Sequence, residues 1–229
     1  MHQFPDEERR GVYRAIFERR DVRSHFIDAP IPNDVLARIL TAAHHAPSVG
    51  FMQPWEFIIV SDRDIRSAIH DRFCQANQSA ASAYSGERQR LYSSLKLEAI
   101  LDSAVNVCVT CNPTVTRGHG LGRQTMPETV MYSAVCAIQN CWLAARAEGV
   151  GVGWVSILNP DELREILNIP SNIVPVGYLC LGYVSRFDDE PELETKGWER
   201  RVPLADALHF DRYGATDSAR AAALLRDRE

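Results

Sequence analysis

The sequence predicts a single α+β domain over residues 1–229, for three reasons. Apolar residues recur at helical spacing within several charged segments, which is typical of amphipathic helices. Shorter runs rich in β-branched residues are typical of buried strands. A chain of 229 residues without an internal repeat or a domain linker can bury about 70% of its unfolded surface. We therefore expect the helices and strands to share one core.

Besides a solvated helix in the last dozen residues, six segments are predicted to be helices, most of them from the helical spacing of their apolar residues. In chain order they are 6–19, 32–45, about 62–78, 91–101, 127–148 and 163–167. The longest, 127–148, is apolar on more than one face, which predicts a central buried helix or a subunit interface, and Gly149 ends it. The last helix is opened by Asn159 as its cap, followed by Pro160 and two acidic residues.

Four apolar runs are predicted to be strands, namely 56–60, 105–111, 151–156 and 174–184. Before the first of them, residues 46–55 form a proline-bounded loop that offers the Ser48 hydroxyl and backbone N–H groups to a ligand, although ordinary turn chemistry explains the same residues. Residues 75–95 are predicted to be a mobile lid, and 112–126 a second flap. Residues 185–229 are predicted to be an extended arm that wraps a partner subunit or its own domain.

Charge and apolar patterning exclude several classes of protein. The formal charge of −5 argues against a nucleic-acid or anionic-membrane partner. No apolar run is as long as a membrane span, and the N-terminus lacks the apolar core of a signal peptide, so we expect a cytoplasmic protein. Cys108 and Cys111 form a C-x-x-C, but it lies within a predicted strand, which favours buried free thiols. No metal site is expected.

Four short motifs together resemble the nitroreductase flavoprotein superfamily. They are Arg-Arg-Asp-Val-Arg at 19–23, Ala-Pro-Ser-Val-Gly-Phe-Met-Gln-Pro-Trp at 46–55, Gly-Val-Gly-Trp-Val-Ser at 151–156 and Arg-Val-Pro-Leu at 201–204. Asp21 and Phe51 stand where nitroreductases usually carry Ser and Asn; with the runs 95–98 and 142–156 they most resemble the BluB-type 5,6-dimethylbenzimidazole synthases. The resemblance implies a nitroreductase-like flavin fold, with a central, mostly antiparallel sheet flanked by helices. It also implies an intertwined homodimer with FMN at the subunit interface.

The same resemblance implies an enzyme, an oxidoreductase of cobalamin biosynthesis. Reduced FMN is implied as a substrate rather than a retained cofactor, with molecular oxygen as co-substrate. The implied reaction fragments reduced FMN to 5,6-dimethylbenzimidazole, the lower ligand of cobalamin, and releases erythrose 4-phosphate. A separate flavin reductase, or free reduced flavin, would supply the substrate.

Arginines are the candidate ligands of the FMN phosphate. Arg19, Arg20 and Arg23 are close in sequence, and planar guanidinium forks match phosphate oxygens bidentately; Arg201 is expected to close the site from the tail. A solvated helix end would also explain Arg19 and Arg20. The resemblance implies further flavin contacts from Val22, Pro47, Ser48, Val49 and Lys96, with 47–49 contributed by the opposite subunit. As a helix-surface residue, Lys96 would otherwise be solvated.

Asp21 and Ser156 are the candidate catalytic residues. A carboxylate beside a phosphate ester is unfavourable unless arginines neutralise it, so the presence of Asp21 among them calls for a reason. The resemblance implies that Asp21 is a general base or proton shuttle at the ribityl chain; a plain salt bridge or a helix cap is the alternative. Ser156 is implied to lie near the isoalloxazine ring and to position a flavin peroxide or relay a proton. Its alternative is a small residue that ends a strand.

Three other functions fit parts of the same pattern. An NAD(P)H-dependent nitro or quinone reductase would retain FMN as a cofactor and leave a face of the flavin open to a nicotinamide. A non-catalytic flavin carrier or sensor would bind FMN and form no product. A reductive dehalogenase of the same fold resembles the 46–55 loop less closely.

Overall fold

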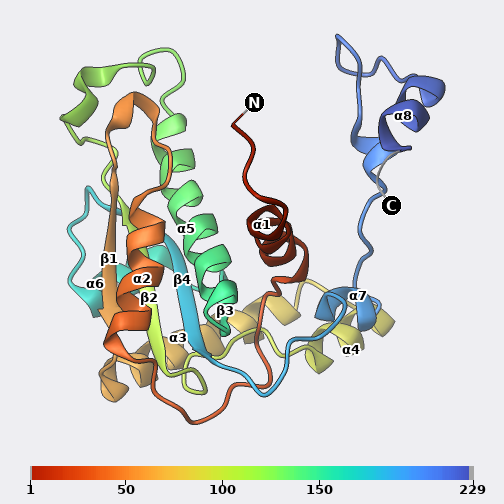
Figure 1. Cartoon of the computed structure of the whole chain (residues 1–229). Helices are drawn as coiled ribbons and strands as arrows, with labels where there is room; N and C mark the ends of the chain where they lie inside the picture. The colour runs from red at the N-terminus through yellow and green to blue at the C-terminus, as the bar shows by residue number, and fades with distance from the viewer. Residues whose placement is uncertain (1, 227–229) are drawn as a thin grey trace. The chain divides into compact units, whose positions relative to one another are not determined.

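The structure, a computed structural model, describes residues 2–226. The chain divides into two compact units, Met1–Pro191 and Glu192–Glu229. The first is built on a four-stranded sheet in the order β1-β2-β4-β3, drawn as arrows in Figure 1. Its strands are β1 Trp55–Val60, β2 Val105–Cys111, β3 Val150–Val155 and β4 Val174–Tyr183. Every neighbouring pair is antiparallel, which confirms the predicted antiparallel sheet of an α+β fold.

The first unit also contains helices. They are α1 Asp6–Glu18, α2 Asn33–His44, α3 Arg63–Ala81, α4 Gly86–Ser94, α5 Thr129–Ala147 and α6 Pro160–Leu167, with the short 3₁₀ helices η1 Val49–Phe51 and η2 Arg117–Gly120. Five of the six predicted helices and all four predicted strands are confirmed to within a few residues. Asn159 caps α6 as predicted, because its side chain accepts a hydrogen bond from the Asp161 N–H at 2.8 Å.

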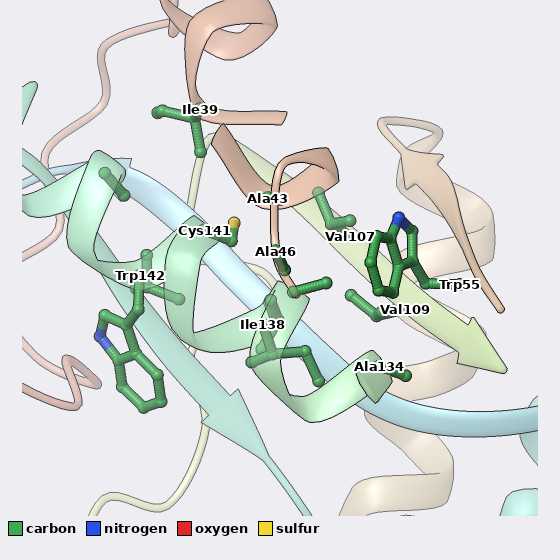
Figure 2. Close-up of a cluster of buried hydrophobic side chains, with 14 of the residues drawn as sticks. Ile39, Ala43, Ala46, Trp55, Val107, Val109, Ala134, Ile138, Cys141 and Trp142 are labelled. Carbon is green, nitrogen blue, oxygen red and sulfur yellow. The ribbon is translucent and has the colours of Figure 1, made fainter. Parts of the chain in front are cut away.

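The sheet is covered on both faces, which gives two hydrophobic clusters. On one face, Ile39 of α2, Ile138 of α5 and Val109 of β2 belong to one cluster, and all three are labelled in Figure 2. On the other, Ile69 of α3 belongs to a second cluster that includes Cys108 of the same strand. Successive β2 residues therefore point to opposite layers, as the period of two requires. The long α5, predicted from its apolar surface to be central, supplies much of the first cluster.

The C-x-x-C pair is part of this core. Cys108 and Cys111 are free thiols, each fully buried on β2. Burial raises the pKa of the Cys108 thiol to about 12 and that of Cys111 to about 11. Neither forms a reactive thiolate near neutral pH, so the prediction of buried structural thiols is confirmed.

The predicted helix at 91–101 is wrong. Helix α4 ends at Ser94, and Leu95 already has extended angles of φ −81° and ψ 135°. The buried guanidinium of Arg66, on α3, donates to the Ile100 carbonyl at 2.6 and 2.9 Å and to the Ser103 carbonyl at 2.6 Å. These contacts hold residues 95–104 in an irregular path, and they are too distant in sequence for apolar periodicity to reveal.

Replacing Arg66 by Lys should therefore lower the free energy of unfolding by about 1–3 kcal/mol, because an ammonium cannot match the fork and leaves buried carbonyls without a donor. Urea denaturation measures the change. The matched control is Arg63→Lys, the same chemical change at an exposed position of α3, which should shift stability by less than about 0.5 kcal/mol. Equal stability of the two variants would contradict this role.

The predicted lid at 75–95 is a pair of helices. It contains the end of α3 and all of α4, joined by a short turn. Tyr92 Oη donates to Asn77 Oδ1 at 2.6 Å, and the Tyr84 and Tyr92 rings stack with centroids 4.9 Å apart. These contacts join the two helices, and opening of this segment as a lid stays a prediction.

Two of the predicted functional loops pack together. The loop at 46–55 contains η1, the loop at 112–126 contains η2, and these short helices are in contact at one end of the sheet (Figure 1). Gly50 and Gly118 both have positive φ, and a Cβ atom on Gly118 would overlap the Gly50 carbonyl. Only two backbones without side chains at this point can approach so closely.

The second unit contains α7 Glu192–Thr195, η3 Leu204–Ala207 and α8 Ser218–Leu225. Asp217 caps α8 by accepting from the Arg220 N–H at 2.9 Å, and the Arg220 guanidinium lies 4.4 Å from the Phe210 ring centroid. The predicted arm begins at residue 185, whereas the unit begins at 192. Its wrapping around a partner stays a prediction. Among the described residues, no helix combines the length and apolar content that crossing a bilayer requires.

Candidate active site

Residues 19–23 leave helix α1 and lie along the edge strand β3. Arg19 already has extended backbone angles, φ −62° and ψ 145°. Asp21 forms a parallel bridge with Val152, and the Val22 N–H donates to the Val152 carbonyl at 2.9 Å. The Arg-Arg-Asp-Val-Arg and Gly-Val-Gly-Trp-Val-Ser motifs, far apart in sequence, are therefore in direct contact.

Two glycines of β3 make room for this contact. A Cβ atom on Gly153 would overlap the carbonyl oxygen of Val22. On Gly151 it would lie 2.7 Å from Val184 Cγ1 and 3.3 Å from Val22 Cγ2. A glycine inside a strand often marks the close approach of another backbone, and here that backbone carries the arginines.

Asp21 is held by both of its carboxylate oxygens. Oδ1 accepts a hydrogen bond from the Trp154 N–H at 3.0 Å, and Oδ2 forms a short ion pair with Arg23 Nη2. The Asp21 side chain is 31% exposed and that of Arg23 is 12% exposed, so the carboxylate is partly accessible to solvent. The salt-bridge alternative for Asp21 is therefore present in the structure, and it leaves the carboxylate open for chemistry.

Burial raises the pKa of Asp21 above its ordinary value of 3.8. The charge and hydrogen bond of Arg23, the Trp154 N–H and the charge of Arg19 each act in the opposite direction, since each favours the carboxylate. A raised pKa makes Asp21 a better proton acceptor than a solvated aspartate.

The arginines of this segment have unused donors. The Nε atoms of Arg19, Arg20 and Arg23 are buried and have no hydrogen-bond partner in the described part of the chain. A buried charged donor without an acceptor is unfavourable. Three such donors within five consecutive residues indicate that an acceptor is supplied from outside the chain. The chemistry of the donors fits an anion with several oxygens, as a phosphate monoester has.

Arg20 differs from its two neighbours. Its Nη1 donates to the Phe17 carbonyl at 2.9 Å and to the Arg19 carbonyl at 2.8 Å, and its Nη2 makes a short bond to the Asp189 carbonyl. These bonds satisfy carbonyls at the end of α1, as a cationic side chain at a helix C-terminus often does. Arg20 is therefore partly structural, as the helix-end alternative predicts, and Arg19 and Arg23 are the better candidates for an anion.

Ser156 is exposed and follows directly after β3, two residues beyond Trp154, whose N–H binds Asp21. It lines a pocket of about 210 Å³ whose other walls include Trp154, Pro175 and Tyr178. The structure thus brings Ser156 to the same end of β3 as Asp21. Its chemical role stays a prediction.

Residues 47–49 contact helix α5 near its start, away from the arginine segment. The Val49 N–H donates to Ser133 Oγ at 3.1 Å, near the start of α5, and Ser48 Oγ accepts from the Gln53 N–H at 3.1 Å. Trp142, nine positions further along α5, donates to the Arg20 carbonyl. At 1.5 Å per residue, the two α5 positions are separated by about 14 Å. Within one chain, residues 47–49 are not brought together with the arginines.

The other two predicted flavin contacts are Lys96 and Arg201. Lys96 pairs with Asp102 within the irregular 95–104 segment, and its side chain is 40% exposed. Arg201 is exposed and belongs to the second unit, so its place in a phosphate site stays a prediction.

Sequence reasoning missed two residues that build this site. Gly153 carries a recognisable signal, because a glycine in the interior of a predicted strand indicates a close backbone approach. Trp142 carries a weaker one: a buried indole usually finds an acceptor for its N–H, but the sequence does not say which.

Comparison with known proteins agrees with this geometry. The model of the nitroreductase family matches residues 16–183, which include every strand of the sheet and both contacting motifs. The chain belongs to the nitroreductase family. The predicted superfamily is thereby confirmed, on well over half of the sequence.

Its relatives include curated members of one branch. A 5,6-dimethylbenzimidazole synthase of Rhodospirillum rubrum is 46% identical over 190 residues, covering 82% of this chain and 90% of that protein. Another, of Rhodobacter capsulatus, is 38% identical over 200 residues, covering 87% of this chain and 96% of that protein. The predicted resemblance to this branch is confirmed.

Solved structures share the fold at low identity. An iodotyrosine deiodinase bound to FMN and 3-iodo-L-tyrosine has a TM-score of 0.68 at 20% identity, covering 89% of this chain and 99% of that one. A BluB-like flavoprotein of Clostridium difficile has a TM-score of 0.66 at 21% identity, covering 88% and 99%. At these identities the likeness concerns the fold alone.

Proposed function

We propose that this chain is a 5,6-dimethylbenzimidazole synthase that fragments reduced FMN in the presence of dioxygen. One ribityl carbon, C1′, is retained in the new imidazole ring, and the other four leave with the phosphate as erythrose 4-phosphate. The pyrimidine ring of the flavin, which a benzimidazole lacks, leaves as a separate fragment. The observation that carries the proposal is Asp21, a proton acceptor with a raised pKa among three arginines with unused donors. The 46% identity to a protein named for this activity supports it.

Arg19 and Arg23 are the proposed ligands of the FMN phosphate. Their buried Nε atoms have no acceptor among the described residues, and a phosphate would supply several. Val22 lies between Asp21 and Arg23 on the backbone fixed against β3, and Arg201 is proposed to add a further guanidinium. Lys96 is proposed as a weaker contact to the flavin.

The remaining contacts are proposed to come from a second copy of the chain. Residues 47–49 contact α5 at Ser133, whereas the arginine segment contacts it at Trp142, so one site that uses both requires two subunits. Helix α1 supports a dimer as well, because it has no buried residue and leaves Val12, Tyr13 and Phe17 exposed. Exposed apolar residues grouped on one helix are typical of a subunit interface.

When bound, reduced FMN supplies the electrons that reduce oxygen and the carbon atoms of the product. The chain positions the ribityl chain and moves protons. Asp21 Oδ1 is anchored to the Trp154 N–H, and each carboxylate oxygen retains a lone pair beyond the bond that it already accepts. Asp21 can therefore take a proton from the ribityl chain without leaving its place. Ser156 is proposed to hold or relay a proton at the ring.

A single-turnover experiment tests the proposed function. FMN is photoreduced without air, the purified protein is added in excess, oxygen is admitted and the products are identified by mass, with NADPH omitted. We expect 5,6-dimethylbenzimidazole and erythrose 4-phosphate in proportion to the FMN lost. Quantitative return of oxidised FMN, without a benzimidazole, would overturn the proposal. Steady NADPH oxidation with a nitro or quinone acceptor would then indicate a reductase.

A further inference from the structure

Trp142 of α5 makes two contacts with the arginine segment. Its indole Nε1 donates to the Arg20 carbonyl at 3.0 Å. Its ring also lies under Arg19, whose guanidinium carbon is 5.3 Å from the ring centroid. Trp142 is 9% exposed, so neither contact competes with much solvent. One buried residue thus contacts both the backbone and a side chain of the segment.

The hydrogen bond fixes the backbone where it leaves α1. The helix ends at Glu18, so the Arg20 carbonyl has no partner within that helix, and a buried carbonyl needs a donor. One turn further along α5, Arg146 Nη2 donates to Glu18 Oε2 at 2.8 Å. Trp142 and Arg146, four positions apart on α5, therefore bind residues 20 and 18. These two bonds fix the backbone at the start of the arginine segment.

The ring contact fixes the direction in which Arg19 presents its donors. A guanidinium that lies over an aromatic face within about 6 Å is held by a cation–π attraction. Its N–H groups all lie in the guanidinium plane, so a ring on one face leaves them free to donate. This agrees with Arg19 Nε, which is buried and has no hydrogen-bond partner among the described residues.

We propose that Trp142 is a positioning residue that holds Arg19 and the Arg20 backbone in place for the phosphate of the flavin. This inference rests on the proposed function, since it takes FMN as the ligand. Trp142 thereby sets the preference for a phosphorylated flavin over riboflavin, which has the same ring and ribityl chain but no phosphate. A residue that only filled the core would affect both flavins alike.

The test compares FMN with riboflavin. Dissociation constants of the purified protein for each oxidised flavin are measured by quenching of flavin fluorescence, without any turnover. Trp142→Phe removes the indole N–H and keeps an aromatic face, so FMN binding should weaken about tenfold while riboflavin binding changes by less than about twofold. Trp142→Leu removes both contacts and should weaken FMN binding about 100-fold.

Trp55→Phe is the matched control. Trp55 is 5% exposed, and its Nε1 donates to His44 Nδ1 at 3.1 Å, so the variant also loses one buried indole hydrogen bond. Figure 2 shows the two indoles at opposite sides of the core cluster, and the partner of the Trp55 indole is His44 rather than the arginine segment. Its ratio of FMN to riboflavin affinity should equal that of the wild type.

A double-mutant cycle separates positioning from general destabilisation. If Trp142 acts through Arg19, Arg19→Gln should weaken FMN binding much less in the Trp142→Leu background than in the wild type. Additive effects, or equal losses for FMN and riboflavin, would overturn the inference and leave the proposed function standing. A wild-type protein that binds both flavins equally well would instead overturn the phosphate site itself, and the inference with it.

Discussion

Replacing Asp21 by Asn is expected to lower the rate of 5,6-dimethylbenzimidazole formation by about 10²- to 10⁴-fold, the range that a general base usually contributes. The amide keeps an oxygen that can accept from the Trp154 N–H, so the segment should stay on β3. It removes one negative charge beside the arginines, so FMN binding should be unchanged or slightly tighter. The measurement is the single-turnover rate, with the FMN dissociation constant determined separately.

The pH profile distinguishes a base from a structural carboxylate. A base must be deprotonated to act, so the rate should rise with pH and fall away below a midpoint above 3.8, since burial raises the Asp21 pKa. The Asn variant should lack this limb. Asp64→Asn, at an exposed position of α3, is the control and should retain the wild-type profile. An Asp21→Asn protein with full activity would mean that Asp21 serves only as the partner of Arg23.

Much of the fold follows from local pattern, because the apolar residues of most elements indicate a helix or a strand without knowledge of the rest of the chain. Helix α5 and strand β2 show this most clearly, since each carries its apolar residues at the spacing of its own geometry. Residues 95–101 carry a helix-like pattern as well, yet they do not form a helix. Their apolar side chains reach the core from an irregular backbone that Arg66 holds from another helix. Local periodicity cannot express such a contact.

The candidate site also has a part that the sequence predicts and a part that depends on contacts between distant residues. The arginines, Asp21 and Ser156 are chemically conspicuous, so their types and order predict an anion site with a carboxylate nearby. The contacts that hold these residues in place cannot be predicted from their types and order. That Arg20 uses its guanidinium on backbone carbonyls, and that Trp142 binds the same segment, depends on how α1 meets α5. Only the folded chain brings those helices together.

Gly153→Ala tests the contact on which the whole site depends. The new Cβ atom would overlap the Val22 carbonyl, so residues 21–23 must move off β3. Overpacking, together with weakening of the Val22–Val152 and Asp21–Trp154 bonds, should lower the free energy of unfolding by about 2–4 kcal/mol. FMN binding should weaken by at least about tenfold, since the displaced arginines lose their common orientation.

Gly11→Ala provides the control, because nothing lies within 4 Å of its added Cβ atom and the residue is in helix α1. Alanine has the higher helix propensity, so this variant should gain up to about 1 kcal/mol. If Gly153→Ala lowers the free energy of unfolding and Gly11→Ala raises it, the loss at position 153 comes from the overlap with the Val22 backbone and not from alanine itself. If Gly153→Ala instead matched the wild type in both stability and FMN affinity, residues 19–23 could not lie on β3 as described. Asp21 would then have no fixed place from which to act, because the Trp154 N–H that anchors it belongs to the same strand.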